Sequence, residues 1–522
     1  MEQISIPDFP FSILALAPFT SEVNPGVTVK LLAVDPLDID QALTALMPSF
    51  FLSLPVAECP AGGLHLRFRK MRDFTPDGLL QSQPYLENLL AAHRFCLEAE
   101  QQKKSTEVII EGVKKWPDLP PISLTQKKKD EEEKKSSLES ILSMVALPEE
   151  DSSVKGATAG GTGFYGALAR KILDSIYTDP IFRSLESCWQ GLRYLGRHLA
   201  EAGGRLSILP ISHNNIEKVL DEQREEIILD PPSVILVDQP LSSSERSVQM
   251  MTQLASFGQE MLVPVLTWLD ASFFQIENWK NLDSLSFLPH HLEKASFARY
   301  KGLQNSDLSR WIGLSCNRFG TRFPYGPENR SRLLPFREKE MLWLSSVWGV
   351  AALMASRVRQ TGWPTGMASS RQICLEDLAL ALEGSVEQSP LEVQWSESRL
   401  EQVSRCGIMA LAGWKGRDSA FLAGDVMAST DSSLSYQTLL CRVSHFILWC
   451  RDNWQEPLLA DELASRLHTA FQLFTKKQGE YPVGDFGVEC HDDKGAIQVL
   501  FRWIPSRHIL PSGQEIVLEF GW

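Results

Sequence analysis

The sequence has 522 residues, too many for one hydrophobic core, since single cores stop growing near about 250–300 residues, and we expect at least two domains. The hydrophobic share of 43% is ordinary for a soluble globular protein, and the formal net charge is −14. This acidic balance argues against general binding to nucleic acid or anionic membranes, which requires a basic face, and suits a highly soluble protein or one with a basic partner.

Residues 1–100 predict a small α/β domain. Its strands are expected where apolar residues run together or alternate, and its helices where apolar residues form one stripe behind an acidic or proline-containing start. The expected strands are 11–17, 27–34 and 63–68, and the expected helices are 35–47 and 84–99.

Residues 101–165 have the composition of a linker, with prolines, glycines and the charge run KKKDEEEKK. One short amphipathic helix is predicted within it, over 136–146, with a serine at its N-cap. Its apolar stripe consists of Leu138, Ile141, Leu142 and Val145.

Residues 166–522 alternate predicted strands with predicted helices, which indicates a mixed or parallel sheet. The expected strands are 205–210, 233–238, 261–266 and 311–315, and the expected helices are 166–177, 181–200, 213–224, 244–257, 338–360, 434–454 and 459–476. Three further strands follow one another, over 486–492, 496–504 and 515–522. The predicted fold class is therefore α/β (α+β), with mixed sheets, flanking helices and a C-terminal antiparallel β segment.

Cysteine use and the apolar runs predict a cytosolic protein without membrane insertion. The nine cysteines form no CxxC pair and mostly lie in apolar stretches, as reduced buried thiols do. The first basic residue is Lys30, so a secretory signal is not expected. No apolar run approaches the roughly 20 residues that cross a bilayer.

Motifs for chemistry are weak, and we expect no catalytic residue, cofactor or metal. GTGFYG (161–166) matches the dinucleotide pattern G-x-G-x-x-G, but the polar residues before it do not predict the buried strand that such a site needs, so we interpret it as a flexible joint. The pair His290-His291 has no cysteine near it in the sequence, and adjacent side chains point apart.

The stretch DPIFRSLESCWQGLRYL (179–195) predicts a packing helix rather than an active site. Asp179 before Pro180 is a good helix start. Arg183, Glu186 and Gln190 are expected on a polar side, and Cys188 has no basic neighbour to activate it. One broad apolar face is expected to carry Ile181, Phe182, Leu185, Cys188, Trp189, Leu192 and Leu195.

The same stretch resembles the signature "DPEFQxLEaaWRGLxYL" of the large contractile-sheath subunit of type VI secretion systems, TssC/VipB. RWIGLSCNRFGTRFPYG (310–326) and EMLWLSSVWGVAALMASRVRQTGW (340–363) resemble further family motifs in the family's order. So do SPLEV (389–393), CGIMAL (406–411), SAFLAG (419–424) and LSYQTLLCRVSHFI (434–447). The resemblance covers about 166–522.

PFSILALAPF (10–19) and LRFRKMRDFTPDGLL (66–80) resemble the small sheath subunit, TssB/VipA. The chain therefore resembles a small and a large sheath subunit fused in one polypeptide. It departs from the family in lacking the basic segment after the first strand and the motif "GGEPYG…GDYxF".

The resemblance implies a structural protomer, not an enzyme, that forms a helical homopolymer in the bacterial cytoplasm. Such a sheath polymerises around an inner tube of Hcp-like protein on a baseplate, contracts to propel the tube, and is dismantled by a Clp-family AAA+ recycling ATPase. The family also implies that strands are exchanged between neighbouring subunits. The candidates are strand 11–17, with Phe11, Ile13, Leu14 and Leu16, and the C-terminal strands, with Val499, Phe501, Ile516, Leu518 and Phe520.

Several alternatives stay open. One alternative is that the candidate strands pair only within their own chain, and another is that the helix 136–146 docks on the chain's own body instead of binding the recycling ATPase. The whole protein is alternatively a sheath-like accessory or adaptor that does not polymerise, or the sheath of a phage-tail-like contractile injection system. An enzyme of the doubly wound class is disfavoured, because no acid, base and nucleophile set is evident.

Overall fold

The computed structural model describes residues 6–20, 30–121, 163–212, 215–380, 389–454, 458–479, 481–493 and 496–522. These residues belong to two compact units. Unit 1 comprises Met1–Pro48, Ser184–Phe323 and Glu340–Trp522, and unit 2 comprises Ser49–Arg183 and Pro324–Lys339. The segment 1–100, expected as one domain, therefore contributes to both units. Within the described ranges, no helix is both long and apolar enough to cross a membrane.

Unit 1 contains a nine-stranded mixed sheet with the order β2-β5-β1-β6-β7-β8-β10-β11-β9. The strands are β1 (Ser12–Ala17), β2 (Leu32–Val34), β5 (Arg205–Pro210), β6 (Val234–Leu241), β7 (Val265–Leu269), β8 (Ile312–Cys316), β9 (Cys374–Leu375), β10 (Ile408–Gly413) and β11 (Ala420–Leu422). All pairings from β5 through β1, β6, β7 and β8 to β10 are parallel, and β2, β11 and β9 pair antiparallel. We call it the main sheet.

Helices cover both faces of the main sheet, because successive side chains of a strand point to opposite sides. On β8, Leu314 joins the core cluster that holds Leu254 of α10, whereas the hydroxyl oxygen of Ser315 lies 2.8 Å from that of Ser346 on α13. Helices α10 and α13 therefore lie on opposite faces. The α-helices that accompany the main sheet in unit 1 are α1 (Ile39–Leu46), α7 (Pro180–Glu201, in unit 1 from Ser184), α8 (Ile216–Glu222), α9 (Arg224–Leu229), α10 (Glu245–Met261), α11 (Leu288–His291), α12 (Ala298–Gln304), α13 (Ser346–Thr361) and α14 (Glu397–Arg405).

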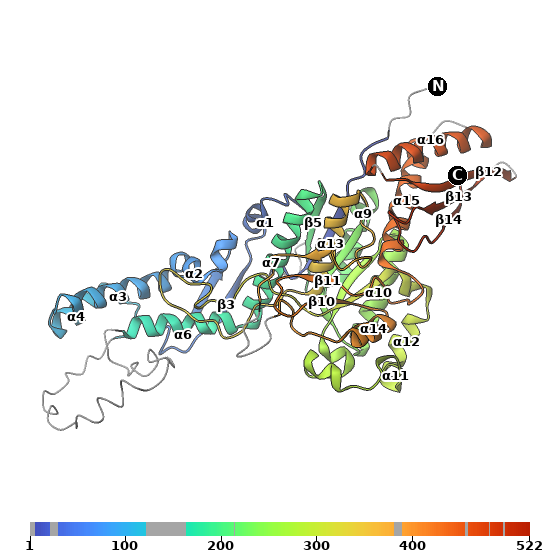
Figure 1. Cartoon of the computed structure of the whole chain (residues 1–522). Helices are drawn as coiled ribbons and strands as arrows, with labels where there is room; N and C mark the ends of the chain where they lie inside the picture. The colour runs from blue at the N-terminus through green and yellow to red at the C-terminus, as the bar shows by residue number, and fades with distance from the viewer. Residues whose placement is uncertain are drawn as a thin grey trace. The chain divides into compact units, whose positions relative to one another are not determined.

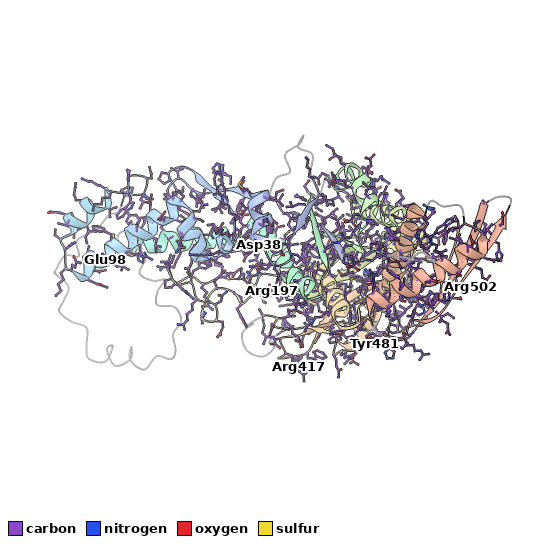
Figure 2. All side chains as sticks on the ribbon, turned by 90° about the horizontal axis from the view of Figure 1, so that it is seen from above. Asp38, Glu98, Arg197, Arg417, Tyr481 and Arg502 are labelled. Carbon is purple, nitrogen blue, oxygen red and sulfur yellow. The ribbon has the colours of Figure 1, made fainter. Side chains whose placement is uncertain are left out.

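The end of the chain forms a second layer of unit 1, which we call the C-terminal module (Figure 1). Helices α15 (Leu434–Asn453) and α16 (Ala460–Gln478) precede a three-stranded antiparallel sheet of β12 (Gly484–Asp493), β13 (Ala496–Pro505) and β14 (Ile516–Gly521). The inner face of this sheet packs on α16, where the ring of Phe471 lies 4.9 Å from Phe501 and 5.1 Å from Trp503. The outer face carries exposed side chains such as Arg502 (Figure 2).

Unit 2 is built around a β-hairpin and a layer of helices. Its elements are β3 (Ser49–Ser53), β4 (Gly63–Arg67), the 3-10 helix η1 (Met71–Phe74), α2 (Pro76–Ser82), α3 (Pro84–Gln101), α4 (Thr106–Val113), α6 (Phe164–Thr178) and the start of α7. The rings of Phe68 and Phe74 stack at 4.2 Å, and Phe182 lies 5.9 Å from each. Segment 324–339 joins this unit through the carboxylate of Asp77, which accepts hydrogen bonds from the Ser331 hydroxyl and the Leu333 backbone N–H.

The predicted fold class is confirmed, including the flanking helices and the three C-terminal strands. The structure differs from the predicted elements in several details, for example in splitting the expected helix 213–224 into α8 and α9. The apolar run 261–266 is mostly the end of α10 and a turn, because Leu262 ends that helix in the left-handed conformation at φ 55°, and β7 begins only at Val265. Helix α13 begins at Ser346 rather than 338. The expected linker 101–165 contains the folded helix α4.

Candidate functional site

The stretch 179–195 forms the start of α7, and its predicted cap is confirmed. The Asp179 carboxylate accepts hydrogen bonds from the backbone N–H groups of Ile181 at 2.8 Å and Phe182 at 3.0 Å. These bonds satisfy two donors that a helix start leaves free, which explains why the helix begins at Pro180. The predicted apolar face is buried except for Ile181, which is 47% exposed.

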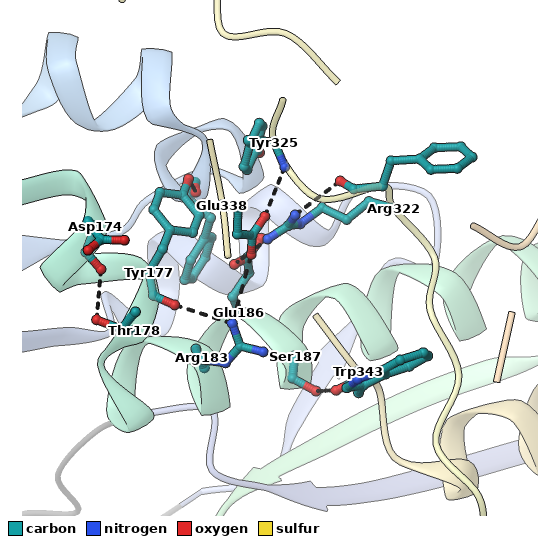
Figure 3. A network of polar contacts seen from close by, with 12 residues as sticks. Asp174, Tyr177, Thr178, Arg183, Glu186, Ser187, Arg322, Tyr325, Glu338 and Trp343 are labelled. Carbon is teal, nitrogen blue, oxygen red and sulfur yellow. Dashed lines mark hydrogen bonds and ion pairs between the residues drawn. The ribbon is translucent and has the colours of Figure 1, made fainter. Parts of the chain in front are cut away.

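Glu186 lies on the predicted polar side of α7, and that side is buried at this position. It is 1% exposed and forms a two-pronged ion pair with Arg322, with its oxygens 2.8 and 3.1 Å from the guanidinium nitrogens (Figure 3). Two parallel hydrogen bonds fix the geometry of such a pair as well as its charge. Removing one partner of a buried pair leaves an uncompensated charge, which typically costs about 3–5 kcal/mol. The pair thus ties α7 to the loop after β8.

Trp189 joins α7 to the segment just after β1, and Gly191 lets α7 pack closely on α13. The Trp189 indole N–H donates to the carbonyl of Phe19, just after β1, at 3.1 Å. A Cβ atom at Gly191 would lie 2.5 Å from the indole ring of Trp348, closer than real atoms approach. Only glycine lets the flat face of Trp348 reach the backbone of α7, which gives a packing reason for the WQGL sequence.

Asp238, on the sheet strand β6, is held by two indoles. Its two carboxylate oxygens accept hydrogen bonds from Trp268 at 2.9 Å and from Trp348 at 2.8 Å. Burial raises the pKa of Asp238, and the indole donors oppose that rise. A buried carboxylate with a raised pKa is a pattern that active sites also show, so its neighbours matter.

Those neighbours offer no activated nucleophile. The thiol of Cys188 lies near Asp238, but burial and the charge of that carboxylate raise the pKa of the thiol, which disfavours the reactive thiolate.

The histidine pair of the sequence lies on α11 and forms ordinary contacts. His291 is buried, with its Nε2 3.3 Å from the carbonyl of Phe274, while His290 pairs with Glu293. In the part of the chain that the structure describes, no three His, Cys, Asp or Glu side chains gather as metal ligands would.

A polar cavity of about 350 Å³ lies between α7, α13 and β9. Its charged lining residues are Arg193, Arg197, Arg359, Glu201, Glu376 and Asp377, and Arg197 is labelled in Figure 2. Arg359 and Glu201 form an ion pair across it. Because cations and carboxylates are equal in number here, this cavity has no charge preference for an anionic or a cationic ligand.

The structure places the predicted exchange strand 11–17 in the interior of the main sheet. Ile13 lies opposite Leu206 of β5 on one side and Val234 of β6 on the other. Phe11, Ile13, Leu14 and Leu16 are all at most 2% exposed. In this chain both edges of β1 are therefore occupied, and the strand has no open edge for a neighbouring subunit.

The C-terminal candidates lie on strands with different neighbours. Val499 and Phe501 belong to β13, which is paired on both sides, and their side chains are buried. Ile516, Leu518 and Phe520 belong to the edge strand β14 and face inward with them. Within the described residues, β12 and β14 have strand neighbours on one side only.

The open edge of β14 is presented by residues that sequence reasoning did not select. The Trp522 N–H donates to the Ile497 carbonyl at 2.8 Å, which fixes that opposed pair as a hydrogen-bonded one. Since hydrogen-bonded and non-bonded pairs alternate in antiparallel sheets, the backbone groups of Val517, Glu519 and Gly521 point away from β13. The alternation of apolar and polar residues in the sequence shows which face each side chain occupies, but it does not show to which edge the backbone groups point. Leu138, Ile141, Leu142 and Val145 of the predicted helix 136–146 lie outside the described residues.

Two similarities to known proteins bear on this architecture. Residues 229–428, from the end of α9 to beyond β11, match the family described as VipB: EvpB/VC_A0108, tail sheath N-terminal domain. The chain is also 22% identical over 316 residues to the type VI secretion system sheath protein TssC1 of Pseudomonas aeruginosa. That similarity covers 51% of this chain and 63% of the relative, so the chain spans under two thirds of the relative's length. Both support the resemblance to the large sheath subunit, and neither bears on a fused small subunit.

Proposed function

We propose that the chain is a structural, non-enzymatic protomer of the contractile sheath of a type VI secretion system. The observation that carries the proposal is the family match over 229–428, because it includes strands β6 to β11 of the main sheet. The relative is itself named as a sheath protein. Polymerisation around an inner tube and contraction belong to this proposal.

We further propose that residues 1–100 act as a small subunit fused through the segment 101–165 to a large subunit in 166–522. This is supported by β1, which separates β5 from β6 in the main sheet. Without the first segment, both of those strands would expose unpaired backbone groups in the middle of a sheet, which is costly. A covalent link keeps β1 at high effective concentration and fixes a one-to-one ratio of the two parts.

Assembly is proposed to use strand addition at the C-terminal module. The open edge of β14 offers backbone donors and acceptors at Val517, Glu519 and Gly521, and β12 offers a second edge. The occupied edges of β1 make exchange of that strand less favourable than growth at these edges. Neighbouring copies of the chain are the expected donors.

The other partners follow from the proposed sheath role. They are an Hcp-like inner-tube protein, a baseplate and a Clp-family AAA+ ATPase that binds the helix 136–146, all in the bacterial cytoplasm. A peptide of residues 130–150 tests the last contact, and failure to bind the N-domain of the cognate ATPase would remove it from the proposal.

Negative-stain electron microscopy of the purified chain, with and without the inner-tube protein, tests the function. Hollow tubes with a cogwheel cross-section are expected in at least one condition. Monomers or small rings under both conditions would contradict the sheath proposal and favour the non-polymerising accessory. Tubes that form around the inner-tube protein of a phage-tail-like injection system, but not around that of a secretion system, would favour the third alternative.

A further inference from the structure

Unit 2 carries a basic surface on a chain whose net charge is −14. The sequence HLRFRKMR (65–72) contains four basic residues, Arg67, Arg69, Lys70 and Arg72, and its buried members are Leu66, Phe68 and Met71. His65, Arg67 and Arg69 alternate with buried residues and therefore share the exposed face of β4 and its continuation. Concentrated positive charge is unexpected on so acidic a protein.

The same strand presents an open edge. The Leu54 N–H donates to the Gly62 carbonyl at 3.0 Å, which fixes the hydrogen-bonded pairs between β3 and β4. By alternation, the backbone groups of His65 and Arg67 point away from β3. Within the described residues, β4 pairs with β3 alone. The cations thus stand beside unpaired backbone donors and acceptors.

A cavity of about 530 Å³ lies next to this edge. One wall is formed by His65, Arg67, Arg69 and Lys70, and the other by Ser82, Gln83 and Pro84 at the junction of α2 and α3. The carboxylate in the lining, Asp73, accepts the backbone N–H groups of Arg69 at 2.8 Å and Lys70 at 3.0 Å, so it fixes the turn. Cations outnumber this carboxylate in the lining.

An aromatic side chain completes the surface. Phe51 of β3 is 49% exposed, and its ring lies 4.8 Å from that of His65. It gives an extended ligand an apolar contact beside the cationic row. The surface formed by Phe51, His65, Arg67, Arg69 and Lys70 is called the basic hairpin surface.

We propose that the basic hairpin surface binds an extended acidic segment of a partner protein by strand addition to β4. The ligand's backbone pairs with His65 and Arg67, and carboxylates at every second position face the row from Arg67 to Lys70. Charge complementarity selects the partner, because a cationic row beside an open edge favours an acidic strand and repels a basic one. The site uses none of the residues that the proposed copy-to-copy contacts of the C-terminal module use.

The test uses the full chain and a fluorescent peptide of alternating Glu and Val, with binding followed by fluorescence anisotropy. A Lys-Val peptide, a Glu-Pro peptide and inorganic polyphosphate serve as comparisons, because proline removes the backbone N–H that strand addition needs. The Glu-Val peptide is expected to bind, and the Lys-Val and Glu-Pro peptides to bind at least about tenfold more weakly. Equal binding of Glu-Pro peptide or polyphosphate would overturn strand addition in favour of a general anion surface.

The variant Arg67→Glu/Lys70→Glu is expected to lower the affinity for the Glu-Val peptide by about tenfold or more. The matched control, Lys103→Glu/Lys104→Glu, changes two exposed cations of unit 2 that do not line the cavity and should leave the affinity unchanged. Circular dichroism checks that both variants fold. Equal losses in both variants, or none in either, would contradict the proposal.

Other occupants give distinct results. If the chain binds no peptide, yet Arg67→Glu/Lys70→Glu changes its sedimentation as an oligomer, the edge is filled by a second copy and the proposed partner is wrong. If Arg67→Glu/Lys70→Glu aggregates and the peptide does not bind to the unaltered chain, the role of the cations is to prevent two copies from pairing at this edge. That result also overturns the proposal.

Discussion

The two sheets of unit 1 differ in the length of their edge strands. The main sheet ends in β2 and β9, which are only 3 and 2 residues long, so it exposes few unpaired backbone groups. The sheet of the C-terminal module ends in β12 and β14, which are 10 and 6 residues long. Short edge strands are a common device against unwanted pairing. We call the main sheet and its helices the closed body, whereas in the described residues the C-terminal sheet leaves its longer edge strands with a strand neighbour on one side only.

The two sheets also differ in how many of their faces are covered by helices. Helices α10 and α13 cover both faces of the main sheet, whereas the C-terminal sheet packs one face on α16 and exposes Arg502, Ile504 and Val517 on the other. Buried hydrogen bonds, such as those that Arg322 donates to Glu186 and Trp348 donates to Asp238, join distant segments of the closed body. We therefore expect substitutions in the main sheet to lower the free energy of unfolding most, and substitutions at the edge of the C-terminal sheet to lower it least.

The largest effect is expected from Leu236→Pro in β6. Leu236 lies opposite Ala15 of β1 and Leu266 of β7, so proline would remove a ladder hydrogen bond in the middle of the sheet. A loss of about 4 kcal/mol or more is expected, measured as the free energy of unfolding in denaturant or as failure to obtain folded chain. A stable, soluble variant would contradict the closed body.

Arg322→Ala should follow, with a loss of about 3–5 kcal/mol in the free energy of unfolding, because Glu186 is left buried and charged. The double variant Glu186→Leu/Arg322→Leu removes both charges and should recover part of the loss. The exposed pair of Arg205 and Asp230 is the matched control, and Arg205→Ala should cost less than about 1 kcal/mol. Equal costs at both pairs would show that burial is not the cause.

Asp238→Asn should act on the main sheet in a pH-dependent way. The folded pKa of Asp238 is raised above its ordinary value of 3.8, so its contribution to stability is full below that value and is lost as the pH rises through the folded pKa. Asparagine deprives one indole N–H of its acceptor, which costs about 1–3 kcal/mol at low pH.

That cost should shrink as the pH rises, because the charged wild-type carboxylate becomes unfavourable in its buried site. Amide hydrogen exchange at β6 and at β13, measured across the pH range, distinguishes an effect on the main sheet from an effect on the C-terminal sheet. A difference between variant and wild type that is constant with pH, or equal in β6 and β13, would contradict this assignment.

The smallest effect on stability is expected from Glu519→Pro in β14. Its N–H points to the open edge, so proline should leave the bonds to β13 intact and change the free energy of unfolding by less than about 1 kcal/mol. Phe520→Pro, one residue along, is the control, because its N–H faces β13 and its replacement should be clearly more damaging. The reverse order would mean that the deduced register of the edge is wrong.

The sequence predicted local structure well and contacts between distant residues poorly. The runs RLSILP and SVILVD and the three C-terminal strands are β5, β6 and β12–β14, because apolar alternation is a local property. The burial of Glu186 depends on Arg322, which is 136 residues away, and the need for glycine at 191 depends on Trp348. Neither partner can be deduced from helical periodicity, which shows only which side a residue faces.

The position of β1 illustrates the same limit. Its apolar run predicted a buried strand, but a sequence pattern does not say which strands flank it. Because β1 lies between β5 and β6, neither of its edges is open to another strand. We therefore propose that strand addition takes place at Val517, Glu519 and Gly521 of β14, which the sequence did not single out.

The most direct test of the proposed sheath role is electron microscopy of the Glu519→Pro chain beside the unaltered chain, under the conditions that assemble tubes. We expect tubes from the unaltered chain and only folded, dispersed protomers from the variant, since proline blocks strand addition at the open edge. Tubes of equal number and length from both chains would contradict growth through β14. The absence of tubes from either chain, with the inner-tube protein present, would contradict the sheath role itself.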